Sequence, residues 1–282
     1  MAQHFIDKHF QPQHAGKCDL LIEINPARIS YAIVDQVNGH LQVLFNTSLL
    51  RKNGRIAMLD QLNELVNTKQ ELKFHFRKTK VSLQTFKFTF IPKELFNQSL
   101  IQEYTKFVNP DSVESDSVQV CDMKSLGIKS LIVLDQAIKT YTAQQFNRPL
   151  FFSQAHPFIV GIDKIITTEG IFLALNIQSE TIECTVYNSE KLLFYNLFDC
   201  FNADELNYFL LYILNNLQIN IKNCHVLLAG DIEKDNPYYQ RIQKYFQNIH
   251  FVNTRQLLSQ TSLTDELIPH MFFSLLCLDL CG

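Results

Sequence analysis

The sequence is poor in glycine and has no apolar run long enough to cross a membrane. Only 8 of its 282 residues are glycine, well below the usual share of about 7%. The longest apolar run, Met271–Leu278, is far shorter than the roughly 20 residues that a transmembrane helix needs. The N-terminal residues lack the apolar core and cleavage site of a secretory signal. These absences favour a cytoplasmic protein without a membrane span.

Neither the charge nor the cysteine spacing indicates a particular ligand. The 25 basic and 28 acidic residues give a net charge of -3, which argues against a general nucleic-acid binder. The 7 cysteines are odd in number and include no CxxC pair, a pattern typical of buried, reduced thiols in a cytosolic protein. No nucleophile-elbow, zinc-protease or P-loop motif occurs. We therefore expect no nucleic-acid partner, no metal and no identifiable catalytic residue.

What the sequence does contain is an internal repeat. Residues 21–49 and 173–198 each have an apolar strand, a polar four-residue corner, an alternating strand, a tight turn and a third strand. With 46% hydrophobic residues in 282, the chain can fill the cores of two domains. The duplicated three-stranded meander predicts two similar halves.

Helical and strand patterns alternate in the rest of the chain. The spacing of apolar residues predicts helices over 56–72, 93–108, 137–146, 203–217, 236–246 and 264–280, and further strands over 81–90, 130–134, 225–229 and 251–252. Asn202, with Glu205 at the third helical position, forms a capping-box pattern at the start of the fourth helix. That helix is apolar on most faces, so we expect it to be buried, with these residues in the core: Leu206, Phe209, Leu210 and Ile213.

The two polar corners carry an altered phosphate-binding pattern. In the second corner Asn176 stands where the DxGGGT pattern has its aspartate, residues 178–180 stand where it has three glycines, and Thr181 keeps the threonine. In the first corner Glu23 and Asn25 stand at the aspartate and glycine of DxGxT. The chain thereby resembles the actin-like ATPase superfamily, which includes actin, Hsp70 and the sugar kinases. Its middle and C-terminal segments are similar to the PilM and GspL branch and to an uncharacterised bacterial family with degenerate nucleotide motifs.

The resemblance implies an α/β architecture, a duplicated actin-like ATPase fold of the ribonuclease H-like type with two lobes around a cleft. We predict a flexible N-terminal tail over 1–17, a first lobe over 18–149 and a second lobe over 150–282. The strand ending at Gly230 looks like the superfamily's adenosine-contacting strand. Arg28 is the basic residue near the corners, and its strand neighbours suggest that it points outward. The candidate degenerate nucleotide cleft would comprise Glu23, Asn25, Arg28, Asn176, Ser179, Thr181 and Gly230.

The altered residues are poorly suited to ATP. Glycine lets backbone N–H groups approach a phosphate, whereas Gln178, Ser179 and Glu180 each add a side chain, and Pro26 lacks an N–H group. Asn176 is neutral and is a poorer ligand for a hard cation than aspartate. We expect a pseudo-ATPase without a cofactor, a non-catalytic cytoplasmic scaffold or adaptor that binds unidentified protein partners, with residues 80–96 as a candidate surface. The alternative is an atypical ATP-binding protein, an ATPase or small-molecule kinase that uses ATP and Mg²⁺.

Overall fold

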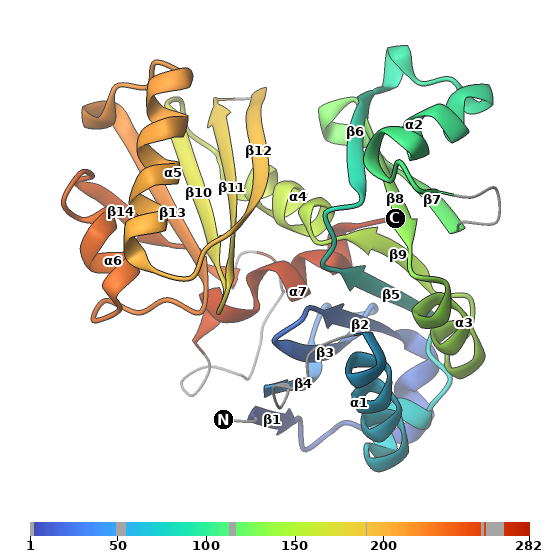
Figure 1. The fold of residues 1–282 in the computed structure, drawn as a ribbon. Coiled ribbons are helices and arrows are strands. Elements are labelled where there is room, and N and C mark those ends of the chain that lie inside the picture. Colours follow the sequence, from blue (N-terminus) through green and yellow to red (C-terminus); the bar gives the residue numbers. More distant parts are fainter. Residues whose placement is uncertain (1–2, 49–54, 113–116, 190, 255–256, 258–267) are drawn as a thin grey trace. The chain divides into compact units, whose positions relative to one another are not determined.

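The computed structural model describes residues 3–48, 55–112, 117–189, 191–254, 257 and 268–282. The chain divides into two compact units (Figure 1). Unit 1 comprises Met1–Pro157, Leu257–Asp265 and Leu275–Gly282, and unit 2 comprises Phe158–Gln256 and Glu266–Ser274. Unit 1 thus includes the C-terminal residues, which the predicted lobe boundary at residue 150 assigned to the second lobe.

Unit 1 is built on a six-stranded sheet in the order β1-β4-β3-β2-β5-β9. The first predicted meander is confirmed as β2, β3 and β4, which pair antiparallel, while β5 and β9 extend the sheet in parallel. The helix predicted over 56–72 ends earlier, as α1 (Arg55–Thr68) followed by the short helix η2 (Gln70–Lys73). The strands are β1 (Gln3–Ile6), β2 (Cys18–Ile24), β3 (Arg28–Asp35), β4 (Leu41–Ser48), β5 (Lys78–Leu83) and β9 (Leu150–Ser153).

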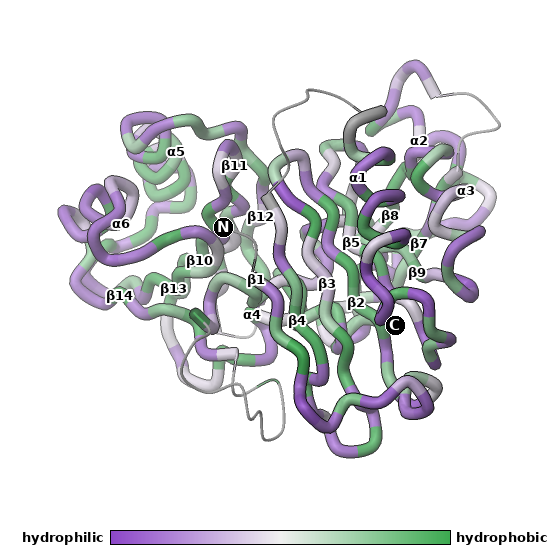
Figure 2. Tube along the Cα trace, turned by 90° about the horizontal axis from the view of Figure 1, so that it is seen from below, coloured by the Kyte–Doolittle hydropathy of each residue, from purple (hydrophilic) through white to green (hydrophobic). Residues whose placement is uncertain are grey.

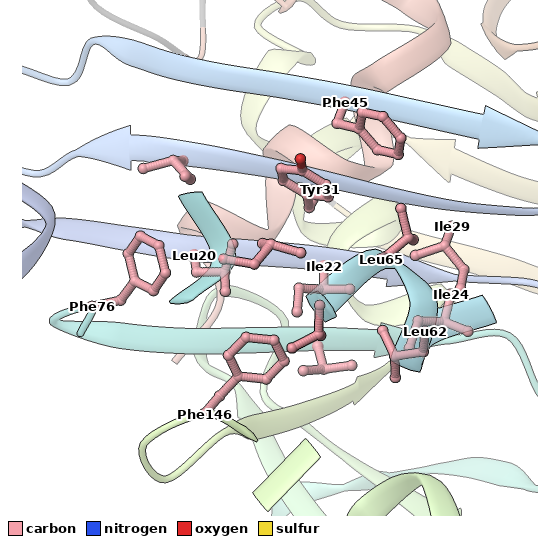
Figure 3. Close-up of a cluster of buried hydrophobic side chains, with 14 of the residues drawn as sticks. Leu20, Ile22, Ile24, Ile29, Tyr31, Phe45, Leu62, Leu65, Phe76 and Phe146 are labelled. Carbon is pink, nitrogen blue, oxygen red and sulfur yellow. The ribbon is translucent and has the colours of Figure 1, made fainter. Parts of the chain in front are cut away.

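A large hydrophobic cluster of unit 1 lies on one face of this sheet, although the central strands β2 and β3 are buried on both faces. Because successive strand residues point to opposite faces, Leu20, Ile22 and Ile24 of β2 all project into this cluster (Figure 3). They pack with Leu62 and Leu65 of α1. Aromatic residues fill the rest, and Tyr31 stacks on Phe45 with ring centroids 4.9 Å apart.

Part of the segment predicted as a flexible tail is ordered. Strand β1 pairs antiparallel with β4, and a short helix, η1 (Pro12–Lys17), follows. His4 Nε2 lies 2.7 Å from Glu71 Oε1, which also accepts a 2.7 Å hydrogen bond from the Tyr31 hydroxyl. The polar residues of this segment suggested a solvated tail, but backbone pairing at the sheet edge and this side-chain network hold it.

A small sheet in the order β6-β8-β7 completes unit 1. The single strand predicted over 81–90 is wrong, because β5 and β6 belong to different sheets. The Thr85 backbone donates to Gln154 Oε1 at 3.0 Å and accepts from Gln154 Nε2 at 3.2 Å, so the chain turns there. The helix predicted over 93–108 is likewise divided. The elements are β6 (Phe88–Pro92), η3 (Lys93–Leu95), η4 (Gln98–Leu100), α2 (Ile101–Val108), β7 (Ser117–Met123), η5 (Lys124–Leu126), β8 (Ile128–Leu134) and α3 (Gln136–Gln145).

Unit 2 contains a five-stranded sheet in the order β12-β11-β10-β13-β14. Its first three strands are the second predicted meander, so the two copies of the repeat lie in separate sheets, as the repeat predicts. Strand β13 pairs with β10 in parallel, just as β5 pairs with β2 in unit 1. The elements are α4 (Ala155–Ile165), which begins in unit 1, β10 (Ile171–Ile177), β11 (Thr181–Asn188), β12 (Lys191–Asp199), α5 (Ala203–Asn216), η6 (Ile221–Asn223), β13 (Cys224–Gly230), α6 (Pro237–Ile242) and β14 (Asn248–Phe251).

Helix α5 begins at the predicted cap but is not buried all round. Asn202 Oδ1 accepts the N–H groups of Asp204 and Glu205, which confirms the cap. Leu206, Leu210 and Ile213 are buried as predicted, whereas Phe209 is only half-buried. Figure 2 shows that α5 is hydrophobic over much of its length, yet Tyr208 is 64% exposed and Tyr212 is 53% exposed. The prediction of a fully buried helix is therefore wrong for this face.

The C-terminal segment returns to unit 1. The single helix predicted over 264–280 is instead η8 (Pro269–Phe272), α7 (Phe273–Cys277) and η9 (Leu278–Leu280), with residues 264–267 outside the described part. Buried Lys80 of β5 donates from Nζ to the Asp279 carbonyl oxygen at 2.8 Å. Gln36 donates from Nε2 to Asp279 Oδ1 at 2.7 Å. No helix among the described residues is long and apolar enough to cross a lipid bilayer.

Candidate functional site: two altered phosphate corners

The first corner joins β2 to β3 in unit 1. Asn25, which is buried, accepts at Oδ1 the backbone N–H groups of Ala27 at 2.9 Å and Arg28 at 2.8 Å. Its own N–H group donates to the Arg28 carbonyl oxygen at 3.1 Å. Asparagine side chains favour such local turns because the amide oxygen mimics a backbone acceptor. The backbone donors of this corner are therefore directed at a side chain of the corner itself.

Glu23 and Arg28 form a buried ion pair beside this turn. Glu23 Oε1 lies 3.5 Å from Arg28 Nη2, and both side chains are less than a tenth exposed. The expectation that Arg28 points outward is thus wrong, because the buried carboxylate of Glu23 lies within reach of the guanidinium. A buried ion pair is costly to break, since either partner alone would be an uncompensated charge. Glu23, Asn25 and Arg28 are brought together, but their charges compensate each other.

The second corner joins β10 to β11 in unit 2. The Gln178 N–H group donates to the Thr181 carbonyl oxygen at 2.9 Å, which closes the turn. The Glu180 carbonyl oxygen accepts the Cys200 N–H group at 2.8 Å. Gln178 and Thr181 are buried, whereas Ser179 and Glu180 are exposed. Two side chains therefore project from the tip of a corner that in the family pattern holds glycine.

Asn176, which the sequence pattern predicts at the superfamily's metal-facing position, contacts a carboxylate. Its Nδ2 donates to Glu183 Oε2 at 2.6 Å and to Ser274 Oγ at 3.1 Å. The Tyr195 hydroxyl donates to the other Glu183 oxygen at 2.6 Å. Sequence analysis did not single out Glu183, although strand alternation would have placed it directly opposite Asn176 in the β10–β11 register. The amide of Asn176 is thus committed to a buried hydrogen-bond network.

Gly230 is required by packing at the end of β13. A β-carbon there would lie 2.0 Å from the Ile177 carbonyl oxygen and 2.7 Å from Asn176 Oδ1, and the residue has a φ of +85°. The same carbonyl accepts the Asp231 N–H group at 2.6 Å. Only glycine adopts this backbone conformation easily. Gly230, which the sequence pattern assigns to an adenosine-contacting strand, therefore has a structural reason to be glycine in this chain.

The described residues include no cluster of metal-ligating side chains, and burial disfavours the thiolate form of two cysteines. No group of three or more histidine, cysteine, aspartate or glutamate side chains in this part of the chain is placed to hold a metal ion. Burial raises the pKa of the Cys121 and Cys200 thiols to about 11, which disfavours the reactive thiolate. Burial also lowers the pKa of His156 to about 4, so its ring is neutral at pH 7.

The predicted partner surface over residues 80–96 is only partly accessible. Lys80 is buried, whereas Lys87, Lys93 and Phe86 are exposed. The bend at Thr85 divides the segment between two sheets. Lysines and aromatic residues therefore do not alternate along one continuous strand here.

Comparison with known proteins places the chain in a family. A family model described as "Protein of unknown function (DUF3822)" matches residues 7–249. The chain belongs to this family. No curated protein is similar to this DUF3822 member at a significant level.

Solved structures share the fold of this DUF3822 chain. A Bacteroides thetaiotaomicron protein described as having an actin-like ATPase fold and unknown function has a TM-score of 0.76 at 18% identity, covering 86% of this chain and 93% of that one. The PilM–PilN type IV pilus biogenesis complex gives 0.63 at 12% identity, with 93% and 97% covered. The ethanolamine utilization protein EutJ from Carboxydothermus hydrogenoformans gives 0.50 at 8% identity, with 94% and 89% covered. These similarities confirm the predicted actin-like ATPase fold.

Proposed function

We propose that this chain is a pseudo-ATPase, a non-catalytic cytoplasmic scaffold or adaptor that acts by binding other proteins. The observation that carries the proposal is the closed first corner, where Asn25 Oδ1 accepts the N–H groups of Ala27 and Arg28. A phosphate-binding corner works by presenting such N–H groups to an anion. Here an incoming phosphate would first have to displace the Asn25 side chain.

The charges at the two corners add to this barrier. The positive charge of Arg28 is already compensated by Glu23 at 3.5 Å. The exposed Glu180 carboxylate would repel a phosphate group at the second corner. Asn176 supplies an amide that donates to Glu183, not a carboxylate free to hold Mg²⁺ through water.

We favour the binding of a protein partner as the function of this fold. PilM, whose fold is similar, is found in a complex with PilN. An actin-like chain can thus serve in an assembly of proteins.

Each phosphate contact that is lost costs roughly 1.5–3 kcal/mol because such contacts are charge-assisted. Losing two or three would weaken ATP binding by about two to six powers of ten.

Thermal unfolding with and without Mg-ATP tests the proposal. We expect no saturable shift in Tm at millimolar Mg-ATP, and no heat of binding in titration calorimetry. A ligand at one hundred times its Kd would stabilise the fold by about 2.7 kcal/mol, a shift of roughly 5–10 °C. Such a shift would refute the proposal and support the alternative of an atypical ATP-binding protein.

The variant Asn25→Gly makes the test sharper. It removes the side chain that accepts the corner N–H groups and adds the residue that the family pattern has there. If the closed corner is what excludes phosphate, this variant gains affinity for Mg-ATP or inorganic pyrophosphate relative to the wild type. The matched control is Asn38→Gly, since Asn38 Oδ1 accepts the His40 N–H group in a turn between β3 and β4. Equal nucleotide binding by both variants would show that Asn25 does not close the site.

A further inference from the structure

The two copies of the repeat differ at one sheet edge. In unit 1 the third meander strand, β4, has β1 on its outer side, paired antiparallel. In unit 2 the corresponding strand, β12, ends the sheet, and β11 is its only partner strand among the described residues. An edge strand presents a row of backbone donors and acceptors that can pair with another strand. By analogy with β1 on β4, the outer side of β12 is the position where a further antiparallel strand could pair.

Exposed hydrophobic side chains are frequent in the stretch of sequence that contains this edge strand and α5. Of the 12 large hydrophobic residues that are exposed in the described part, 5 lie in the stretch 193–212. Isolated exposed residues of this kind need no explanation, but a cluster indicates an interaction site. The five are Leu193 of β12, Phe201 before α5, and Tyr208, Leu211 and Tyr212 of α5.

A series of ring contacts connects the edge strand with the outer face of α5. Phe198 of β12 stacks on Phe209 with centroids 4.3 Å apart, and Phe209 contacts Tyr208 at 5.6 Å. Tyr208 in turn stacks on Tyr212 at 6.3 Å. Phe194 and Phe198 are themselves only half-buried against the core of unit 2. The core of this unit therefore continues as an aromatic surface on the β12 side.

The regular part of β12 is complementary to itself. A bulge between Val186 and Tyr187 of β11, opposite Leu193, limits regular pairing to the residues from Phe194 to Asp199. If two copies of this stretch pair antiparallel, Asn196 can lie opposite Asn196 of the second copy. Phe194 of each copy then lies opposite Phe198 of the other. Aromatic pairs directly opposite each other are among the favourable cross-strand contacts. The Leu197 N–H group donates to Asn196 Oδ1 at 3.0 Å, so a carbonyl oxygen of the second copy would have to displace this side-chain acceptor.

We propose that the chain forms a symmetric dimer in which β12 pairs antiparallel with β12 of a second copy. The two five-stranded sheets become one, and the two-fold axis passes near Asn196. Because the two-fold axis is perpendicular to the joined sheet, both copies of α5 lie on the same face of that sheet. The tyrosines of the two α5 helices then approach each other. Stable interfaces bury about 1,200–2,000 Å² in total, so the α5 face contributes along with the six paired residues. This inference does not depend on the proposed pseudo-ATPase function.

The oligomeric state tests the proposal on the full chain. Light scattering after size exclusion, over a concentration series, is expected to give twice the chain mass at the upper end. Asn196→Lys places two ammonium groups at the axis and is expected to raise the dimer Kd by at least about tenfold. The matched control, Gln240→Lys, makes the same charge change at an exposed residue of α6 and is expected to leave the Kd unchanged. Both variants should keep the wild-type far-UV circular dichroism spectrum, because both positions are exposed.

A cysteine at the axis tests the register. Residues directly opposite each other in antiparallel strands have Cα atoms about 4.5–5.5 Å apart, which a disulfide can span. Asn196→Cys is therefore expected to form a covalent dimer on air oxidation with a copper catalyst, and Gln240→Cys is not. Six of the seven native cysteines are buried and Cys121 is half-buried. The wild type therefore measures the background of crosslinking by native cysteines. A wild type that is monomeric at 100 µM, about the upper end of typical assays for weak interfaces, overturns the proposal. A dimer that survives Asn196→Lys and gives no Asn196→Cys crosslink also overturns it.

Discussion

Gly230→Ala separates a packing role for this glycine from a role in holding adenosine. The residue has a φ of +85°, and the added methyl group would lie 2.0 Å from the Ile177 carbonyl oxygen. A side chain in this backbone region costs about 1–3 kcal/mol, and forcing an extra carbon into a packed site costs about 1–3 kcal/mol more. Ile177 cannot retreat easily, because its carbonyl also accepts the Asp231 N–H group. We expect a loss of about 2–6 kcal/mol in the free energy of unfolding.

The matched control lies in the same unit. Gly170 has a φ of +144°, but a β-carbon there would meet its nearest neighbour, the His225 ring, at an ordinary 3.5 Å. Gly170→Ala should therefore carry only the backbone cost of about 1–3 kcal/mol. Urea unfolding followed by far-UV circular dichroism measures both variants. If the two lose the same stability, the steric argument fails, and a nucleotide-contacting role for Gly230 becomes the better explanation.

Three further predictions follow from burial and charge. Leu210→Ala should cost about 2–5 kcal/mol in urea unfolding because the side chain is buried, whereas Asn215→Ala, at an exposed position of α5, should stay within about 0.5 kcal/mol. Burial lowers the pKa of His156 to about 4, so the folded state binds its proton less readily than the unfolded state. The contribution of neutral His156 to the free energy of unfolding is complete above the unfolded pKa of about 6.5. As the pH falls from about 6.5 to about 4, up to about 3 kcal/mol of it is lost. His156→Leu should flatten the pH dependence of stability in this range, and an unchanged pH dependence would contradict the assignment. Lys80→Ala should leave buried Asp19 and the Asp279 carbonyl without their ammonium partner, and hydrogen exchange should then become faster in residues 278–281 than in the control Lys87→Ala.

The sequence was sufficient for the architecture because the repeat has a strong local signal. Alternating apolar residues define β2 to β4 and β10 to β12, and each meander forms its own sheet. The cap at Asn202 was likewise readable, since its geometry depends only on residues within one turn. Patterns of this kind are local and need no knowledge of distant contacts.

Features that depend on distant residues were not predictable. The turn at Thr85 relies on Gln154, which lies 69 residues further along the chain. Strand β1 is polar, and its network with Glu71 becomes visible only once β4 and η2 are in place. At the candidate site, the assignment of the altered residues stays a prediction, and their contacts were not foreseen. The contact of Asn176 with Glu183 follows from strand register and could have been predicted, whereas Glu23 lies opposite Ser30 in the register, so its ion pair with Arg28 depends on side-chain packing.

The return of the C-terminal segment to unit 1 has a consequence for how the chain folds during synthesis. Unit 2 is inserted in the sequence between the main part of unit 1 and the residues of η9. Lys80 and Gln36 meet Asp279 only after about two hundred intervening residues have been made, and contacts of such separation form late. Unit 2 can therefore complete its sheet while Lys80 of unit 1 still lacks the Asp279 carbonyl and, among the described residues, has only Asp19 as a partner. The first-synthesised unit is then the last to gain its full set of contacts.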